Sequence, residues 1–176
     1  MARCGFVYFL LLLPLLELEA NPSDPTVVSG QASCISTPEK LEITAHDKTI
    51  ISWKDFSIGS KETTRFNLPN SRSVILNRVG SHNPSKIEGL LSSNGIVYLL
   101  NKNGLLITPS GKIETAGFLA STLDISDQDF LSGGDILFTG SSGSITNLGA
   151  IQCSSGDVIL IASQLKNDGG IGGVGF

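Results

Sequence analysis

The chain has 176 residues, which is enough for one domain with a substantial hydrophobic core. Charged residues make up only 16% and aromatic residues 6%, and the 20 glycines favour β structure with many tight turns. The net charge of -4 provides no basic surface for nucleic acid, so no nucleic-acid partner is expected. Two histidines, and two cysteines outside the N-terminal segment, leave little material for a zinc site. We therefore expect no metal and no cofactor.

Residues 1–20 have the pattern of a secretory signal peptide. Arg3 supplies a positive charge, and an apolar run from Cys4 to Leu16 follows it. This run is shorter than the about 20 apolar residues that a membrane-spanning helix needs. We expect cleavage after Ala20 and export of the remaining chain. The alternative is an uncleaved membrane anchor.

Export would permit a disulfide bond between Cys34 and Cys153. The two residues are 119 positions apart, and nothing in the sequence places their Cα atoms within bridging distance. We expect both thiols to be free.

The exported chain begins with a proline-containing segment, residues 21–40, which we expect to be an extended lead-in with one edge strand at Val27-Val28. Alternation of apolar and polar residues then predicts strands at 41–44 and 49–53. These form either a hairpin or two successive strands. Three apolar side chains that follow are expected to plug the open end of a core: Trp53, Phe56 and Ile58.

The central and C-terminal regions repeat short apolar runs that are closed by Asn or Gly turns. The clearest repeat is Asn147–Ile151, which Asn167–Ile171 echoes at an offset of 20 with Asn, Gly and Ile in matching places. A period near 20 with short strands is typical of a solenoid of stacked β coils. With strands about 4.8 Å apart, roughly seven or eight coils would form a short rod.

One segment, Ala120–Leu131, is compatible with a helix. Ser126 is placed to cap a short helical turn, with Asp129 at the third position after it. We expect a brief excursion off the rod here.

Four stretches carry a resemblance to a known family: IISWKDFSIG (50–59), RFNLPNSRSVILNRV (65–79), NPSKIEGLLSSNGIVYLLNKNGLL (83–106) and GFLASTLDISDQDFLSGG (117–134). Residues 41–131 resemble the N-terminal haemagglutination-activity domain of filamentous-haemagglutinin-type exoproteins. These are the exported partners of bacterial two-partner secretion. The resemblance covers about 90 contiguous residues, and ILNRV and FLASTLDISDQDFL are its most distinctive parts.

The resemblance implies an all-β fold, a right-handed parallel β-helix with an N-terminal cap and short antiparallel strands outside the helix. Residues 41–134 would form the secretion domain, and 135–176 would continue the coils as a truncated rod. Family membership further implies export by the general secretion machinery, transit of the periplasm, and recognition by a dedicated outer-membrane transporter. The product would be secreted or held on the surface of a Gram-negative cell, where contact with a host surface is possible.

Two segments that are expected to form turns match the family's motifs and are expected to contribute to recognition by the transporter. Asn77-Arg78-Val79 matches its Asn-Arg-Val, and Asn101-Lys102-Asn103-Gly104 stands where the family typically has Asn-Pro-Asn-Gly. Lys102 replaces the proline, so the turn is less constrained in φ. The alternative roles are structural: Asn77 bonding across coils, Arg78 solvated, and Asn101, Asn103 and Gly104 forming a turn.

Two rival functions belong to other classes. A surface module that binds carbohydrate or a host receptor would carry an exposed stripe of aromatic side chains. A polysaccharide-degrading β-helix enzyme would need clustered Asp with Arg or Lys along one groove, and the sequence shows no such grouping. We therefore expect no enzymatic activity.

The remaining polar residues are expected to be unremarkable surface groups. Asp124, Asp127 and Asp129 do not fit the spacing of a calcium loop and are expected in a solvated loop. His46 and His82 have no partner at metal-ligand spacing.

Overall fold

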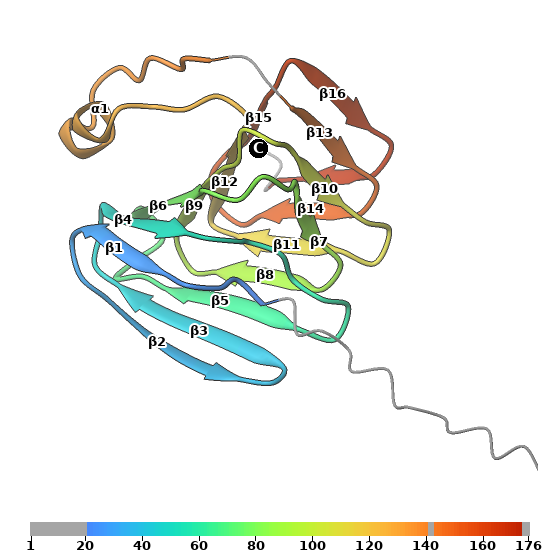
Figure 1. The fold of residues 1–176 in the computed structure, drawn as a ribbon, viewed down its shortest axis with the longest axis horizontal. Helices are drawn as coiled ribbons and strands as arrows, with labels where there is room; N and C mark the ends of the chain where they lie inside the picture. Colours follow the sequence, from blue (N-terminus) through green and yellow to red (C-terminus); the bar gives the residue numbers. More distant parts are fainter. Residues whose placement is uncertain (1–20, 141–142, 174–176) are drawn as a thin grey trace, which may run out of the picture.

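The computed structural model describes residues 21–140 and 143–173, which form a β-solenoid with a single short helix (Figure 1). The expected signal peptide, residues 1–20, lies outside the described residues. In the part of the chain that is described, no helix is long and apolar enough to cross a membrane.

Three sheets form the sides of the rod, and each turn of the chain contributes a strand to two or three of them. The six-stranded sheet contains, in spatial order, β1 (Thr26–Ser29), β4 (Thr49–Trp53), β6 (Val74–Val79), β9 (Ile96–Leu100), β12 (Gly117–Ser121) and β15 (Val158–Ile161). The four-stranded sheet contains β16 (Gln164–Asn167), β13 (Ser144–Asn147), β10 (Leu105–Ile107) and β7 (Ser85–Ile87). The seven-stranded sheet contains β17 (Gly170–Gly172), β14 (Ala150–Cys153), β11 (Lys112–Thr115), β8 (Leu90–Ser93), β5 (Thr63–Asn67), β3 (Lys40–Ala45) and β2 (Ala32–Thr37).

The strands within each sheet are parallel except at the N-terminal end of the rod, where β1 pairs with β4 and β2 with β3 in antiparallel fashion. The predicted parallel β-helix with antiparallel accessory strands is therefore confirmed. Without β2, the seven-stranded sheet holds six parallel strands, so the described rod has about six coils. The expectation of seven or eight was too high because the cap and a long excursion use residues that do not add coils.

The predicted offset of 20 residues is the register of the last two coils. Asn147 pairs with Asn167 and Ile151 with Ile171 on neighbouring parallel strands. The amide of Asn147 donates through Nδ2 to Oδ1 of Asn167 at 2.8 Å, so identical side chains bond along the rod. The repeat in the sequence is thus a stacking repeat.

Glycines stack at the corner between the four-stranded and seven-stranded sheets. A Cβ atom at Gly111 would lie 2.2 Å from the carbonyl oxygen of Ile87, and one at Gly149 would lie 2.3 Å from that of Gly111. The next corner, Gly169, has the same relation to Gly149 at 2.3 Å. Because real Cβ contacts are never so short, the corner requires glycine in successive coils.

The N-terminal end of the rod is closed by the two antiparallel strands and by aromatic side chains. The lead-in forms two strands, β1 and β2, where one was expected. The segments at 41–44 and 49–53 are successive strands, because β3 and β4 belong to different sheets. Trp53 packs edge-to-face on Phe56 at 5.5 Å, and Phe56 stacks on Phe66 at 6.5 Å. These rings are fully buried, as predicted for a plug.

Both described cysteines are free thiols, as expected. Cys34 lies in β2 and Cys153 in β14, five strands apart in the seven-stranded sheet. At about 4.8 Å per strand this separation is on the order of 24 Å, well beyond the Cα distance that a disulfide can bridge.

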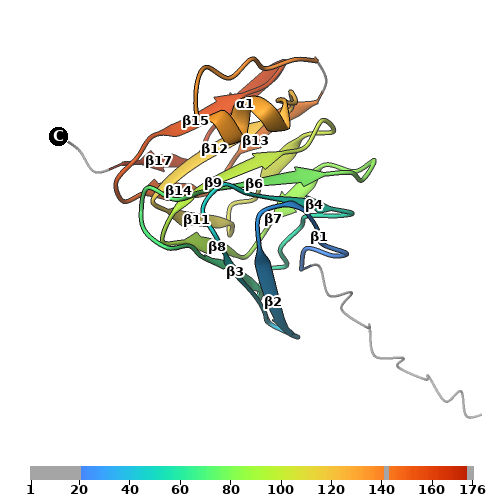
Figure 2. The ribbon, with the colours of Figure 1, turned by 90° about the vertical axis from the view of Figure 1, so that its left-hand side faces the viewer.

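The excursion leaves the rod after β12 and returns at β13. Its one helix, α1 (Asp127–Ser132), is capped by Ser126, whose side chain accepts a hydrogen bond from the backbone N–H of Asp129 at 3.0 Å. The predicted cap is therefore confirmed, whereas the helix covers only the end of the predicted segment, because Ala120 and Ser121 belong to β12. We call residues 122–140 the strap, because Figure 2 shows them lying over the outer face of the six-stranded sheet.

Candidate functional site

Asn77 is a core residue in the middle of β6, and the prediction that Asn77-Arg78-Val79 forms a turn is wrong. Its side chain is 0% exposed. The indole Nε1–H of Trp53 donates to Oδ1 of Asn77 at 2.9 Å, and Nδ2 of Asn77 donates to the backbone carbonyl of Tyr98 at 3.2 Å. The amide therefore links three successive coils, which confirms its expected structural role. Val79 is also buried.

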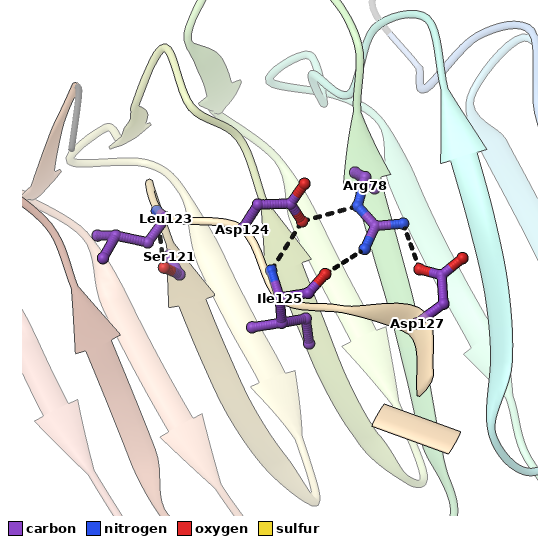
Figure 3. Close-up of polar contacts among 6 residues, drawn as sticks. All are labelled: Arg78, Ser121, Leu123, Asp124, Ile125 and Asp127. Carbon is purple, nitrogen blue, oxygen red and sulfur yellow. Dashed lines mark hydrogen bonds and ion pairs between the residues drawn. The ribbon is translucent and has the colours of Figure 1, made fainter. Parts of the chain in front are cut away.

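Arg78 points outward from the next position of the same strand and is not solvated, contrary to the alternative considered above. Its Nε donates to Asp124 and its Nη1 to Asp127, both at 2.8 Å, while Nη2 donates to the backbone carbonyl of Ile125 at 2.9 Å (Figure 3). The Arg78 side chain is only 24% exposed. The side chains of Asp124 and Asp127 are exposed, as expected, at 61% and 42% accessible, but both also bind this guanidinium, which the sequence did not predict.

The surroundings of Arg78 favour its charged form. Burial alone works against the charge, but the hydrogen bonds and negative charges of Asp124 and Asp127 outweigh it, so the pKa of Arg78 is raised above its ordinary value. Arg78 is thus a permanent cation that fixes the start of the strap to β6.

Two further contacts hold the strap. Lys48, in the turn between β3 and β4, donates through Nζ to the carbonyl oxygen of Leu131 at 2.7 Å, at the C-terminal end of α1 where a cation is favourable. Phe130 packs edge-to-face against Tyr98 of β9 with 5.8 Å between ring centroids. Asp124 and Thr139 exchange backbone hydrogen bonds at 2.9 Å, which draws the two ends of the strap together.

The segment Asn101–Gly104 is a turn, as predicted, and it bonds to the preceding coil. Asn101 is 2% exposed; its Oδ1 accepts from the backbone N–H of Asn103 at 2.9 Å, and its Nδ2 donates to Ser85 Oγ at 3.0 Å. Asn103 donates through Nδ2 to the carbonyl oxygen of Ser81 at 2.6 Å. Gly104 has φ +117°, and a Cβ there would lie 2.6 Å from the carbonyl oxygen of Ser144. A turn without proline is therefore fixed by its amides and glycine.

The two motif segments meet on one surface. A cavity of about 230 Å³ lies between the carboxyl ends of β6 and β9 and the start of the strap. Its lining combines two cations and one carboxylate with aliphatic side chains: Ser52, Arg78, Val79, Gly80, Leu100, Lys102, Leu123 and Asp124. Of the six predicted site residues, Arg78 and Val79 reach this cavity, whereas Asn77 and Asn101 are buried inside the coils.

The structure gives little support for catalysis or metal binding at this surface. The acidic residues and Arg78 do form a grouping that the sequence did not reveal, but they bond to one another. Across residues 21–140 and 143–173, no three His, Cys, Asp or Glu side chains are placed to share a metal ion. His46 and His82 are both exposed.

Sequence reasoning missed the strap contacts, although a signal was present. In the runs Val74–Leu76 and Ile96–Leu100 every residue is apolar, although successive side chains of a strand point to opposite faces of the sheet. Such continuous runs indicate a strand that is buried on both faces. They predict a cover on the outside of the rod as well as a core inside it.

Comparison with known proteins assigns the chain to a family. The model of the TPS secretion domain family matches residues 20–174. The chain belongs to this family. The crystal structure of the HMW1 secretion domain from Haemophilus influenzae aligns with a TM-score of 0.81 and 36% identity, over 86% of this chain and 42% of that one. The resemblance and the fold inferred from the sequence are thereby confirmed.

Two curated relatives are heme/hemopexin-binding proteins of Haemophilus influenzae. One is 45% identical over 91 residues, 51% of this chain and 10% of that protein. The other, from strain Rd, is 39% identical over 105 residues, 59% of this chain and 12% of that protein. The chain thus spans only about a tenth of the length of either relative, so its similarity to them concerns the secretion domain.

Proposed function

We propose that this domain is the secretion signal and folding nucleus of a filamentous-haemagglutinin-like adhesin, and that an outer-membrane two-partner-secretion transporter recognises it. The observation that carries the proposal is the family match over residues 20–174, which includes the whole described rod. The proposed route leads through the general secretion machinery, guided by a signal peptide at residues 1–20, and across the periplasm to the outside of the cell.

The burial of the motif amides suggests how recognition and folding are related. Asn77 and Asn101 are 0% and 2% exposed in the coiled rod, so their side chains are out of reach of a partner once the coils have stacked. We propose that residues 70–106 are recognised before they are packed. The same amides then bond across coils, and folding outside the membrane withdraws them from the transporter. Export would thereby gain direction from folding.

The proposed role is not enzymatic. Arg78 and Asp124 line the cavity, but Arg78 is bound to the carboxylates of Asp124 and Asp127, so these charges neutralise one another and are not arranged as a catalytic set for a substrate. The rival of a carbohydrate-binding surface lacks its expected aromatic stripe, because the described Phe, Tyr and Trp residues are buried or half-buried. Heme or hemopexin binding, named for two relatives, is not proposed for this domain.

Co-expression with a matched transporter tests the proposal. We expect the protein in the medium when the transporter is present and in the periplasm when it is absent. Removing residues 70–106 should leave the protein in the periplasm even with the transporter. Normal export of that deletion, or equal amounts in the medium without a transporter, would show the proposal to be wrong.

A further inference from the structure

The outer face of the six-stranded sheet carries apolar side chains that a solenoid does not need for its core. In register across β4, β6, β9 and β12 lie the residues that we call the outer row: Ile50, Leu76, Tyr98 and Leu119. They form a hydrophobic cluster separate from the interior of the rod, together with Leu100 and side chains of the strap. A rod with polar residues at these positions would need no cover.

The strap is the cover of this face, and it comes late in the sequence. The other parallel coils are offset by 20 to 27 residues, with 22 between Leu90 and Lys112, but Lys112 pairs with Ala150, 38 positions on. The extra residues include the strap. Its anchors join positions far apart: 49 residues separate Arg78 from Asp127, and 83 separate Lys48 from Leu131. A chain that emerges N-terminus first therefore completes the outer row before its cover is available.

The charges around the outer row define what can bind there. Arg78 and Lys48 each bond to the strap beside the row, and the strap meets them with the carboxylates of Asp124 and Asp127 and with the Leu131 carbonyl. Between these anchors the strap places Phe130 on Tyr98. A complementary partner segment therefore presents an aromatic or aliphatic side chain flanked by carboxylates.

The row also continues beyond the strap. Leu119 pairs with Ile159 of β15, which remains 43% exposed in the closed fold. This residue extends the same apolar surface toward the C-terminal end of the rod, where it offers a partner a point of contact next to the covered part.

We infer that the outer row is the surface by which the transporter holds the incompletely folded domain, through a segment with the chemistry of the strap, and that closure of the strap displaces it. The inference rests on the proposed function and adds the surface and the release step. Arg78 lies in the six-stranded sheet itself and holds the closed strap by binding its first residues.

The test compares binding of full-length variants to the immobilised periplasmic region of the matched transporter. D124N/D127N removes the carboxylates that Arg78 holds, and F130S removes the ring on Tyr98. Hydrogen exchange at the amides of Asp129 and Gly133 reports whether the strap has opened. We expect faster exchange and binding tightened by about tenfold, which corresponds to about 1.4 kcal/mol. Adding Y98S should abolish that gain. The matched control is K166A, which removes an exposed ion pair between β16 of the four-stranded sheet and Asp168.

Two results would overturn the inference: faster exchange with unchanged binding, or no faster exchange in either variant, since the contacts with Arg78 and Tyr98 would then not be what holds the strap closed. Export of the wild-type protein, measured in parallel with and without the transporter, separates this failure from that of the proposed function. A wild-type protein that is exported only with the transporter, but whose opened strap binds no better, retains the function and loses the inference.

Discussion

Replacement of the buried Asn77 by alanine should destabilise the domain without touching its surface. The variant leaves the indole N–H of Trp53 buried without an acceptor and takes one donor from the carbonyl of Tyr98, bonds that now measure 2.9 and 3.2 Å. An unsatisfied buried group costs about 1–3 kcal/mol, and the small cavity adds to this, so we expect a loss of about 2–4 kcal/mol.

Urea unfolding measures this loss. With a slope of about 2 kcal/mol per molar urea, the midpoint should fall by about 1–2 M. N83A is the matched control, because Asn83 is exposed and its side chain has no bond in the structure. In the W53F background, where the indole donor is gone, N77A should cost about 1 kcal/mol less. A midpoint for N77A within error of N83A would refute the structural role of Asn77. Loss of transporter-dependent export with unchanged stability would instead identify Asn77 as a recognition group without a structural role.

Three further outcomes are expected. G149A should lower the free energy of unfolding by about 3 kcal/mol, since its Cβ would lie 2.3 Å from a backbone carbonyl, whereas G170A, where the space is open, should be nearly neutral in the same urea assay. Alkylation of Cys153 followed by mass spectrometry should be much slower in the native than in the denatured protein, because burial raises the pKa of this thiol; equal rates would contradict its placement. The hydrogen bond from Asn67, followed by the bond and charge of Lys40, lowers the pKa of Glu42, so its stabilising contribution is present above the ordinary carboxyl pKa and disappears as the pH falls through the lowered one. In N67A the pKa of Glu42 measured by NMR should rise toward its ordinary value, and an unchanged value would argue against this contact.

The rod could be predicted from the sequence because a solenoid is built from local rules. The 20-residue offset between Asn147 and Asn167 is their stacking register in the structure. The glycines at turns form the corners, where carbonyl oxygens of the preceding coil leave no room for a Cβ atom. Ser126 with Asp129 predicted the helix cap for the same reason: the signal and the structure lie within a few residues.

The candidate site could be predicted only in part, because it depends on contacts between distant residues. Asn77 was expected in a turn since Asn favours turns, but its partner is an indole 24 residues earlier. A solvated position was the alternative role for Arg78, yet its partners lie 46 and 49 residues later. No local pattern pairs these residues. The apolar outward positions are a signal for a cover that was not used, and they do not show which segment provides it.

Fusion of the full chain to a periplasmic reporter enzyme, measured as the ratio of activity in the medium to that in the periplasm, tests the secretion role most directly. We predict that the reporter reaches the medium only when the matched outer-membrane transporter is co-expressed, and that it stays in the periplasm when residues 70–106 are removed. A reporter that remains in the periplasm with the transporter present, or that reaches the medium equally well without it, would contradict the account.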